Sequence, residues 1–255
     1  MRTFQERCTR YSAALVLPVL LGAVACGGGS GDAEDRADAK KGARASQGVK
    51  AGGAADRDRP AALKAMALTD ADVGARHRIR ALNNGVAAAY GKAESSATPA
   101  RCRPLDQMLS YSSSPQPKAF HPYSVIEKGS TYTEPKGTEL VVGLAAHDTA
   151  GAKKVMAGLR EAVAKCGSGF ESAKGTYGDV EDWPAQGLGD DAVAYVLQGG
   201  VNGESASARY TVIRSGSTVV TFQATNLEAP WELTGPDLDL IDAQLDRVTK
   251  AQAGA

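Results

Sequence analysis

The sequence predicts one α+β domain, in which helices cover a mainly antiparallel sheet, preceded by an export leader and a flexible tether. Three observations support this prediction. Short runs rich in apolar, β-branched and aromatic residues lie at 192–197, 208–213 and 218–224, with turn residues between the runs, which is typical of strands joined by hairpins. Apolar residues recur with a helical period at 152–166 and 238–248. Before residue 60 the chain shows neither pattern.

The N-terminus has the pattern of a secretory signal peptide. Arg2, Arg7 and Arg10 supply positive charge, and an uncharged run of small and aliphatic residues follows at 13–25. This run is shorter than the ~20 apolar residues that span a bilayer and suits the apolar core of a signal peptide. We therefore expect residues 1–25 to be removed on export.

The predicted cleavage site, Ala23-Val24-Ala25 followed by Cys26, has two interpretations. Small residues before a cysteine resemble the lipobox of bacterial lipoproteins, in which the thiol receives a diacylglyceryl group, although Ala23 departs from the usual aliphatic residue. The same residues satisfy the small-x-small pattern of the ordinary signal peptidase, which releases a soluble protein.

The number of cysteines favours lipidation of Cys26. Cys8 leaves with the leader, and Cys26, Cys102 and Cys166 remain. If Cys102 pairs with Cys166, Cys26 is left unpaired, and an unpaired cysteine in an exported protein requires an explanation. A covalent diacylglycerol on Cys26 supplies two acyl chains, which give stable attachment. We expect the protein to be held by this lipid on the cell membrane, facing the extracytoplasmic side.

Residues 26–59 are predicted to form a disordered tether, and residues 60–255 the folded domain. The tether is rich in Gly, Ala, Ser and charged residues and has no aromatic residue. Such a segment cannot bury enough apolar surface to offset its loss of conformational entropy. The remainder is long enough for one domain with a substantial core.

The domain is predicted to open with a helix over 61–71 and a basic strand. In that strand Arg76, Arg78 and Arg80 alternate with less polar residues, so we expect one half-buried face and one basic outer face.

A short helix follows Cys102, because Pro104 is favoured in a first helical turn. Prolines and serines then predict a loop over 110–122, and 138–145 is predicted to be a strand. Asp148 is the expected N-cap of the next helix, which runs to about Cys166.

Three strands and a closing helix complete the domain. Asn202-Gly203 and Ser215-Gly216-Ser217 are expected hairpin turns between the strands. The last helix is predicted from about Pro236, with Leu238, Ile241, Leu245 and Val248 as its buried residues. Strands with helices covering one face make an α+β layer fold.

This order of elements resembles the extracellular sensor domain of PknH-type actinobacterial kinases and of actinobacterial lipoproteins that carry the same domain alone. The resemblance rests on the long Ala-rich helix that ends in Cys166, the Gly189-Asp190 pair before a strand, and the turn at 213–220. It extends from about Leu63 to the C-terminus and implies a ligand-sensing domain with a cleft. The family domain typically has two disulfides, whereas this chain has cysteines for one, and no catalytic residue is carried over.

Cys102 and Cys166 are expected to form a disulfide, because the compartment is oxidising and no CxxC or Cys/His metal spacing is present. Two buried free thiols are the alternative.

No catalytic, metal or cofactor motif appears. His77, His121 and His147 have no metal-ligand spacing, and the acids at 237–246 fit a helix N-terminus and a solvated face better than calcium. The GxGxxA match at 187–192 precedes a strand, whereas a dinucleotide loop follows one. We therefore expect neither metal nor cofactor apart from the lipid.

A ligand-site hypothesis concerns aromatic and basic residues. Arg76, Arg78, Arg80 and Tyr123 could bind an anionic ligand, together with Tyr111, His121 and Tyr132 in or near the loop. The alternative is a solvated basic strand face with ordinary core tyrosines.

These features predict a non-catalytic binding or sensing lipoprotein of the cell envelope. The ligand expected is a small molecule, a glycan or a protein. Nucleic acid is excluded, because removal of the leader takes away three arginines and one glutamate and leaves a slightly acidic chain. An envelope hydrolase with an unrecognised site and a lipid or glycolipid carrier are the alternative functions.

Overall fold

The computed structural model describes residues 52–82, 91, 94–201 and 204–254, which belong to one compact unit. The predicted signal peptide (1–25), Cys26 and the tether up to residue 51 lie outside the described residues. Within the described ranges, no helix is long and apolar enough to cross a membrane.

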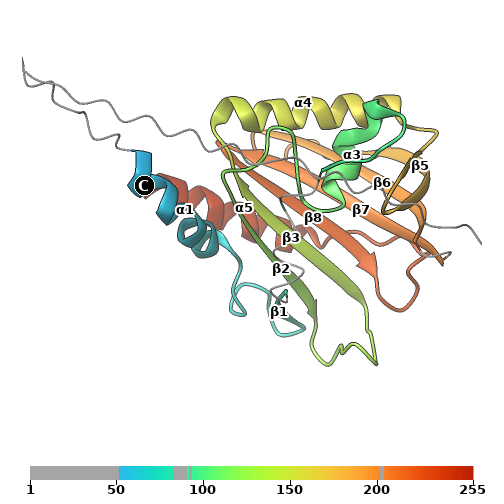
Figure 1. The fold of residues 1–255 in the computed structure, drawn as a ribbon. Coiled ribbons are helices and arrows are strands. Elements are labelled where there is room, and N and C mark those ends of the chain that lie inside the picture. The colour runs from blue at the N-terminus through green and yellow to red at the C-terminus, as the bar shows by residue number, and fades with distance from the viewer. Residues whose placement is uncertain (1–51, 83–90, 92–93, 202–203, 255) are drawn as a thin grey trace, which may run out of the picture. The chain divides into compact units, whose positions relative to one another are not determined.

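The centre of the domain is one antiparallel sheet with the strand order β1-β2-β3-β8-β7-β6-β5-β4 (Figure 1). This confirms the predicted α+β class and the mainly antiparallel sheet. The strands are β1 (His77–Ala81), β2 (Ala119–Glu127), β3 (Thr138–Ala146), β4 (Phe170–Ser172), β5 (Gly175–Trp183), β6 (Asp191–Val201), β7 (Glu204–Ser215) and β8 (Thr218–Asn226).

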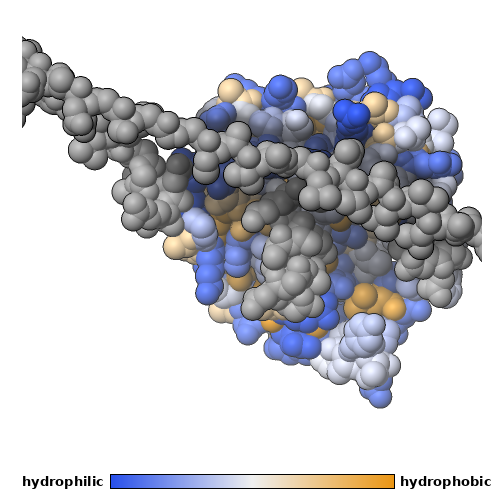
Figure 2. All heavy atoms as spheres, in the orientation of Figure 1, coloured by the Kyte–Doolittle hydropathy of each residue, from blue (hydrophilic) through white to orange (hydrophobic). Residues whose placement is uncertain are grey.

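Helices cover both faces of this sheet, whereas the sequence predicted cover on one. The helices are α1 (Gly52–Met66), α3 (Arg103–Met108, after the 3-10 turn η1 at Ala100–Cys102), α4 (Thr149–Lys165) and α5 (Leu238–Ala253). In Figure 1, α3 and α4 lie on one side of the sheet and α1 and α5 on the other. Hydrophilic residues dominate the upper edge of Figure 2, where α4 faces solvent.

The alternation of side chains along the strands divides the core into two layers. Val212 packs with Met156 and Leu159 of α4, whereas its neighbour Ile213 packs in the layer with Leu63 of α1 and Ile241 of α5. Successive residues of a strand point to opposite faces, so each central strand contributes to both layers.

Several locally encoded features agree with the sequence prediction. Asp148 is the N-cap of α4, where its carboxylate accepts a hydrogen bond from the Gly151 N–H at 2.7 Å. Gly216, with φ +58°, lies in the turn between β7 and β8. The predicted turn at Asn202-Gly203 lies outside the described residues, although β6 and β7 pair antiparallel.

The first helix begins earlier and ends earlier than predicted. It spans 52–66 rather than 61–71, so residues 52–59 of the predicted tether are helical. Alanines have the highest helix propensity, and Leu63 fixes the helix in the core. The helix ends before a turn in which the Asp72 carboxylate accepts the Thr69 N–H at 2.7 Å.

The sequence missed strand β2, of which residues 119–122 fall in the predicted loop. Pro122 in this strand pairs with Gly143 of β3. On the other side, β1 pairs with β2 only from Tyr123 onward. No β1 residue therefore lies opposite Pro122 to accept a hydrogen bond, and proline, which has no N–H, is tolerated at such a position.

Strands β4 and β5 were also missed, because β5 does not alternate regularly. Its register shifts between Tyr177 and Asp179, so Gly178 is an extra residue, a β-bulge. As a result Tyr177 and Val180 both face the α4 layer although they are three residues apart.

The buried face of α5 differs from the predicted one. Leu238 is exposed, and the buried side chains are Leu240, Ile241, Gln244 and Val248. The helix begins at Leu238 after the N-cap Asp237, and Leu238 therefore lies on the outer side of the first turn.

Candidate functional site

A cleft of about 540 Å3 lies between α4 and the connection from β5 to β6. One wall is formed by Arg160, Val163 and Ala164 of α4. The rest is the continuous stretch 182–194, which comprises the end of β5, the connecting loop and the start of β6. A cavity of this size falls in the range of small-molecule sites.

The loop that borders the cleft is held by Asp190. Its carboxylate accepts hydrogen bonds from Arg214 Nη1 and from the Gly216 N–H, each at 2.8 Å, and its own N–H donates to the Arg214 carbonyl at 2.9 Å. Gly189 precedes it with φ +57°, and a side chain there would lie 2.6 Å from the Arg214 carbonyl oxygen. The residues of the GxGxxA match therefore form a loop that Asp190 joins to the turn between β7 and β8.

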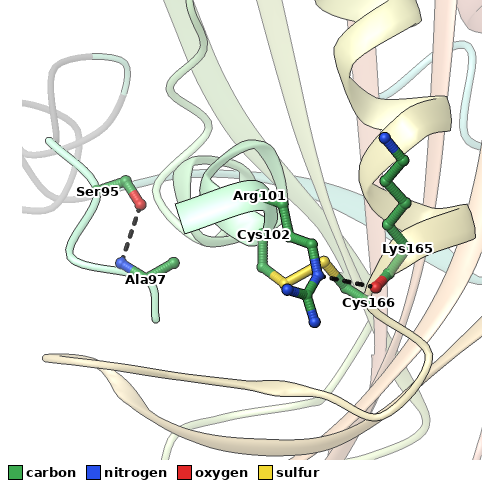
Figure 3. The surroundings of a disulfide bond; sticks show 6 residues. All are labelled: Ser95, Ala97, Arg101, Cys102, Lys165 and Cys166. Carbon is green, nitrogen blue, oxygen red and sulfur yellow. Dashed lines mark hydrogen bonds between the residues drawn. A yellow bond between two sulfur atoms is a disulfide. The ribbon is translucent and has the colours of Figure 1, made fainter. Parts of the chain in front are cut away.

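The α4 wall is fixed by the predicted disulfide, which the structure confirms. The Cα atoms of Cys102 and Cys166 are 5.9 Å apart, and both residues are fully buried. Figure 3 shows a second link beside it, in which Arg101 Nε donates to the Lys165 carbonyl at 3.2 Å. The C-terminal end of α4 is thus joined covalently to η1, and the cleft has a rigid wall.

The cleft has polar groups at its mouth and apolar groups deeper in. Arg160 of α4 forms an ion pair with Asp191 at 2.5 Å. Asp182, on the same lining, is exposed and has no ion pair among the described residues. Val163, Val193 and Ala194 supply the apolar part. This mixture suits a ligand with both polar and apolar groups.

Trp183 at the edge of the cleft holds an arginine. The Arg209 guanidinium lies 4.1 Å from the centroid of the Trp183 ring, a cation–π contact. Burial lowers the pKa of Arg209, although arginine stays charged at any physiological pH. This stack closes one face of the indole ring.

The structure does not bring the predicted ligand residues together. Arg78 donates to the Ser130 carbonyl at 3.1 Å, and Arg80 bonds to Ser124 and forms an ion pair with Glu139. Arg76 is exposed and lines a separate pocket of about 190 Å3. None of these arginines lines the cleft beside α4.

Tyr123 is a core residue on the other face of β2. It is 3% exposed, and it packs with Val125 in the layer under α1 and α5, whereas Arg80 bonds to Ser124 on the opposite face. Burial raises the pKa of Tyr123 far above its ordinary value. The alternative interpretation of a core tyrosine therefore applies to this residue.

The other aromatic residues of that hypothesis are also dispersed. Tyr111 is buried and its hydroxyl donates to Gln223 Oε1 at 2.6 Å, His121 is half-buried, and Tyr132 is 99% exposed.

The described residues contain no cluster of His, Cys, Asp and Glu that could hold a metal ion. His147 is buried at the turn before α4, and burial lowers its pKa. Of the acids at the start of α5, Asp237 serves as the N-cap and Asp242 and Asp246 are exposed.

Sequence reasoning did not identify the residues that line the cleft. Arg160 and Asp191 are 31 positions apart, and neither belongs to a recognisable motif. The one available signal was the glycine-rich run before β6, which sequence reasoning tested only as a nucleotide loop.

Comparisons with known proteins give a likeness of structure and none of sequence. No protein-family model and no curated protein matches the chain. Among solved structures, the crystal structure of the extracellular domain of PknH from Mycobacterium tuberculosis is similar, with a TM-score of 0.45 and 13% sequence identity. The match covers 76% of this chain and 96% of the PknH chain.

Proposed function

We propose that this protein is a lipid-anchored, extracytoplasmic binding or sensing protein of the cell envelope, that it is not an enzyme, and that its ligand occupies the cleft beside α4. The observation that carries the proposal is the disulfide between Cys102 and Cys166. A buried structural disulfide is typical of exported proteins, and this one leaves Cys26 as the unpaired cysteine of the mature chain.

The cleft supports a binding role better than catalysis. Its lining contains no Ser, Thr, Cys, His, Tyr or Lys side chain, so hydroxyl, thiol, imidazole and amine nucleophiles are absent from it. Two of its three aspartates are engaged in ion pairs, Asp190 with Arg214 and Asp191 with Arg160. A carrier for lipid would need a large apolar cavity, whereas four charged side chains line this one.

Metabolic labelling with a clickable fatty acid tests the anchor. We expect label on the wild-type protein in the membrane fraction and none on Cys26→Ala. The tether separates Cys26 from the domain, so the Cys26→Ala protein should unfold at the same temperature as wild type. Unlabelled wild-type protein in the culture medium would show that the chain is secreted without lipid.

Native mass spectrometry of protein extracted from its own membranes tests the cleft. Ala164 lines the cleft and is exposed, so Ala164→Trp should fill it and remove any bound small molecule seen with wild type. Ala150→Trp is the matched control, because Ala150 is exposed on the same helix and does not line the cleft. Equal occupancy in all three proteins would place the ligand elsewhere.

A further inference from the structure

The exposed large apolar side chains of the described residues lie on two segments that meet at one end of the sheet. They are Tyr132, Trp231, Leu233 and Leu238, with exposed fractions of 99%, 64%, 40% and 66%. We call these four residues the apolar end surface. Two segments carry them: the loop of the β2–β3 hairpin and the stretch 227–238, which connects β8 to α5 and includes the first residue of α5.

Hydrogen bonds join the two segments. The Leu227 N–H donates to the Gly137 carbonyl at 2.8 Å, and the Gly137 N–H donates to the Glu228 carboxylate at 3.0 Å. The hydroxyls of Thr138 and Thr234 lie 2.8 Å apart. In Figure 1 the β2–β3 hairpin extends to the bottom of the view, beyond the ends of the neighbouring strands.

The hairpin loop has a defined conformation, so Tyr132 is held in solvent. Ser130 is buried, its carbonyl accepts a hydrogen bond from Arg78, and its hydroxyl accepts the Lys136 N–H at 3.0 Å. The Glu134 N–H donates to the Thr131 hydroxyl at 2.9 Å. An ordered loop that exposes a whole tyrosine loses little entropy when the ring is bound.

The stretch 227–238 is fixed in the same way. The Ser207 N–H donates to the Pro230 carbonyl at 2.7 Å, and the Ser207 hydroxyl donates to the Trp231 carbonyl at 3.1 Å. Trp and Tyr are the residues most often found as energetic hot spots of protein interfaces, and gathered exposed apolar side chains are typical of interaction sites.

Charge identifies the kind of partner. Residues 227–239 contain four acids, Glu228, Glu232, Asp237 and Asp239, and no lysine or arginine. The hairpin loop 128–137 adds Glu134, Lys128 and Lys136, so the two segments together carry a net negative charge. An anionic lipid surface would be repelled by such a surface, whereas a protein with basic residues around an apolar patch would be attracted.

A small pocket of about 190 Å3 lies at the base of the hairpin, beside this surface. Val125, Leu140 and Leu240 supply apolar contacts in it, and the carboxylates of Glu127 and Asp237 lie on its lining. Arg76 and His77 also line it. Its size suits one long side chain, and a lysine or arginine could place its aliphatic part on the apolar residues and its charge near the acids.

We propose that the apolar end surface binds a protein partner that presents apolar side chains among lysines and arginines, one basic side chain entering this pocket. None of the four residues of the apolar end surface lines the cleft.

Two defined probes test the chemistry with the mature chain carrying Cys26→Ala. The first is a 14-residue amphipathic helix of leucine and lysine, and the second is vesicles of phosphatidylglycerol. We expect the peptide to bind to the wild-type chain. The Trp231→Ser, Leu233→Ser double variant, which has the same charge as wild type, should bind the peptide at least tenfold more weakly. Glu232→Lys should weaken binding too, whereas Glu161→Lys, an exposed acid on α4, should not.

Photo-crosslinking in the native cell tests the partner. A benzoylphenylalanine in place of Tyr132 should give a discrete adduct with another protein, and the cross-linked peptide should contain Lys or Arg among apolar residues. The same group in place of Lys153, exposed on α4, should not give this adduct, and Trp231→Ser should remove it. The proposal would be overturned by adducts with lipid or with a second copy of this chain. It would also be overturned if wild type bound the vesicles and the double variant did not, or if all variants bound the peptide equally.

Discussion

The hydroxyl of Tyr123 in β2 donates a hydrogen bond to the side-chain carbonyl of Gln244 in α5, inside the core. The same hydroxyl accepts the Leu68 N–H at 3.3 Å, and the Gln244 amide donates to the Met66 carbonyl at 2.8 Å. These bonds join the sheet, the end of α1 and α5. Buried polar groups are stable only when paired, so this network fixes how both helices lie on the sheet.

Tyr123→Phe should lower the free energy of unfolding by about 1–3 kcal/mol, because the Leu68 N–H and the Gln244 carbonyl lose a buried partner. Tyr132→Phe removes the same hydroxyl from a ring that is 99% exposed and should change stability by less than about 0.5 kcal/mol. Urea unfolding measures both. Equal effects would show that the Tyr123 hydroxyl contributes nothing to stability.

Among the acids of the domain, Asp106 is predicted to be the one whose substitution destabilises the fold most. It is fully buried in α3, pairs with Lys174 at 2.9 Å and accepts the Ser95 hydroxyl at 2.7 Å and the Ser96 N–H at 2.9 Å. Burial acts to raise its pKa, but these partners outweigh burial, and the pKa of the Asp106 carboxyl lies below its usual value.

Asp106→Ala should therefore destabilise the domain by about 2–4 kcal/mol, since it leaves the Lys174 charge and buried donors without a partner. Glu161→Ala breaks the exposed pair with Lys165 on α4 and should leave the stability nearly unchanged, because exposed ion pairs contribute little. Thermal unfolding of the two variants gives the comparison. A small loss for Asp106→Ala would mean that water replaces its partners.

Stability should fall as the pH decreases below about 6.5, the pKa of an unfolded histidine. Burial lowers the pKa of both His121 and His147 in the folded state. Lys64 lowers the pKa of His121 further, and at His147 the charge of Asp148 opposes the lowering while Lys118 adds to it. Between the folded and unfolded pKa values the unfolded chain binds more protons, so protonation favours unfolding. The His121→Gln, His147→Gln double variant should lose stability less steeply over pH 6.5 to 5. If the double variant lost stability between pH 6.5 and 5 as steeply as wild type, other groups would be the cause of the acid sensitivity.

The Cys102→Ala, Cys166→Ala double variant should lose about 4 kcal/mol, because the disulfide closes a loop with a sequence separation of 64 and so reduces the entropy of the unfolded chain. Guanidinium unfolding of wild type and variant, without reductant, measures the loss. The variant should also keep its helix content at low temperature, since Cys102 and Cys166 lie in a core of other apolar residues. An unfolded variant would show that the bond is required for folding as well.

The sequence could predict the elements that depend on local patterns. Asp148 as N-cap, the helical period from Ala152 to Val163 and the turn at Gly216 each lie within one element. It could not predict β2 and β5, because Pro122 and the bulge at Gly178 interrupt the alternation that identifies a strand.

The cleft depends on tertiary contacts and has no local pattern. It forms because the Cys102–Cys166 bond fixes the end of α4 and Asp190 fixes the opposite loop to the β7–β8 turn. Each link connects distant segments. Sequence alone also placed Leu238 in the core. The helical period gives the spacing of buried residues along a helix, but it does not give the residue at which the helix begins.

Alkylation of the mature protein, isolated from its own cells and their culture medium and analysed by intact mass, tests the central claim most directly. The account predicts that iodoacetamide adds to no cysteine before reduction, because Cys102 and Cys166 are bonded and Cys26 carries lipid, and to two cysteines after reduction. The mass should include one diacylglyceryl group on the peptide that begins at Cys26. One alkylated cysteine before reduction, located at an unlipidated Cys26, would contradict the account and show a secreted protein with a free thiol.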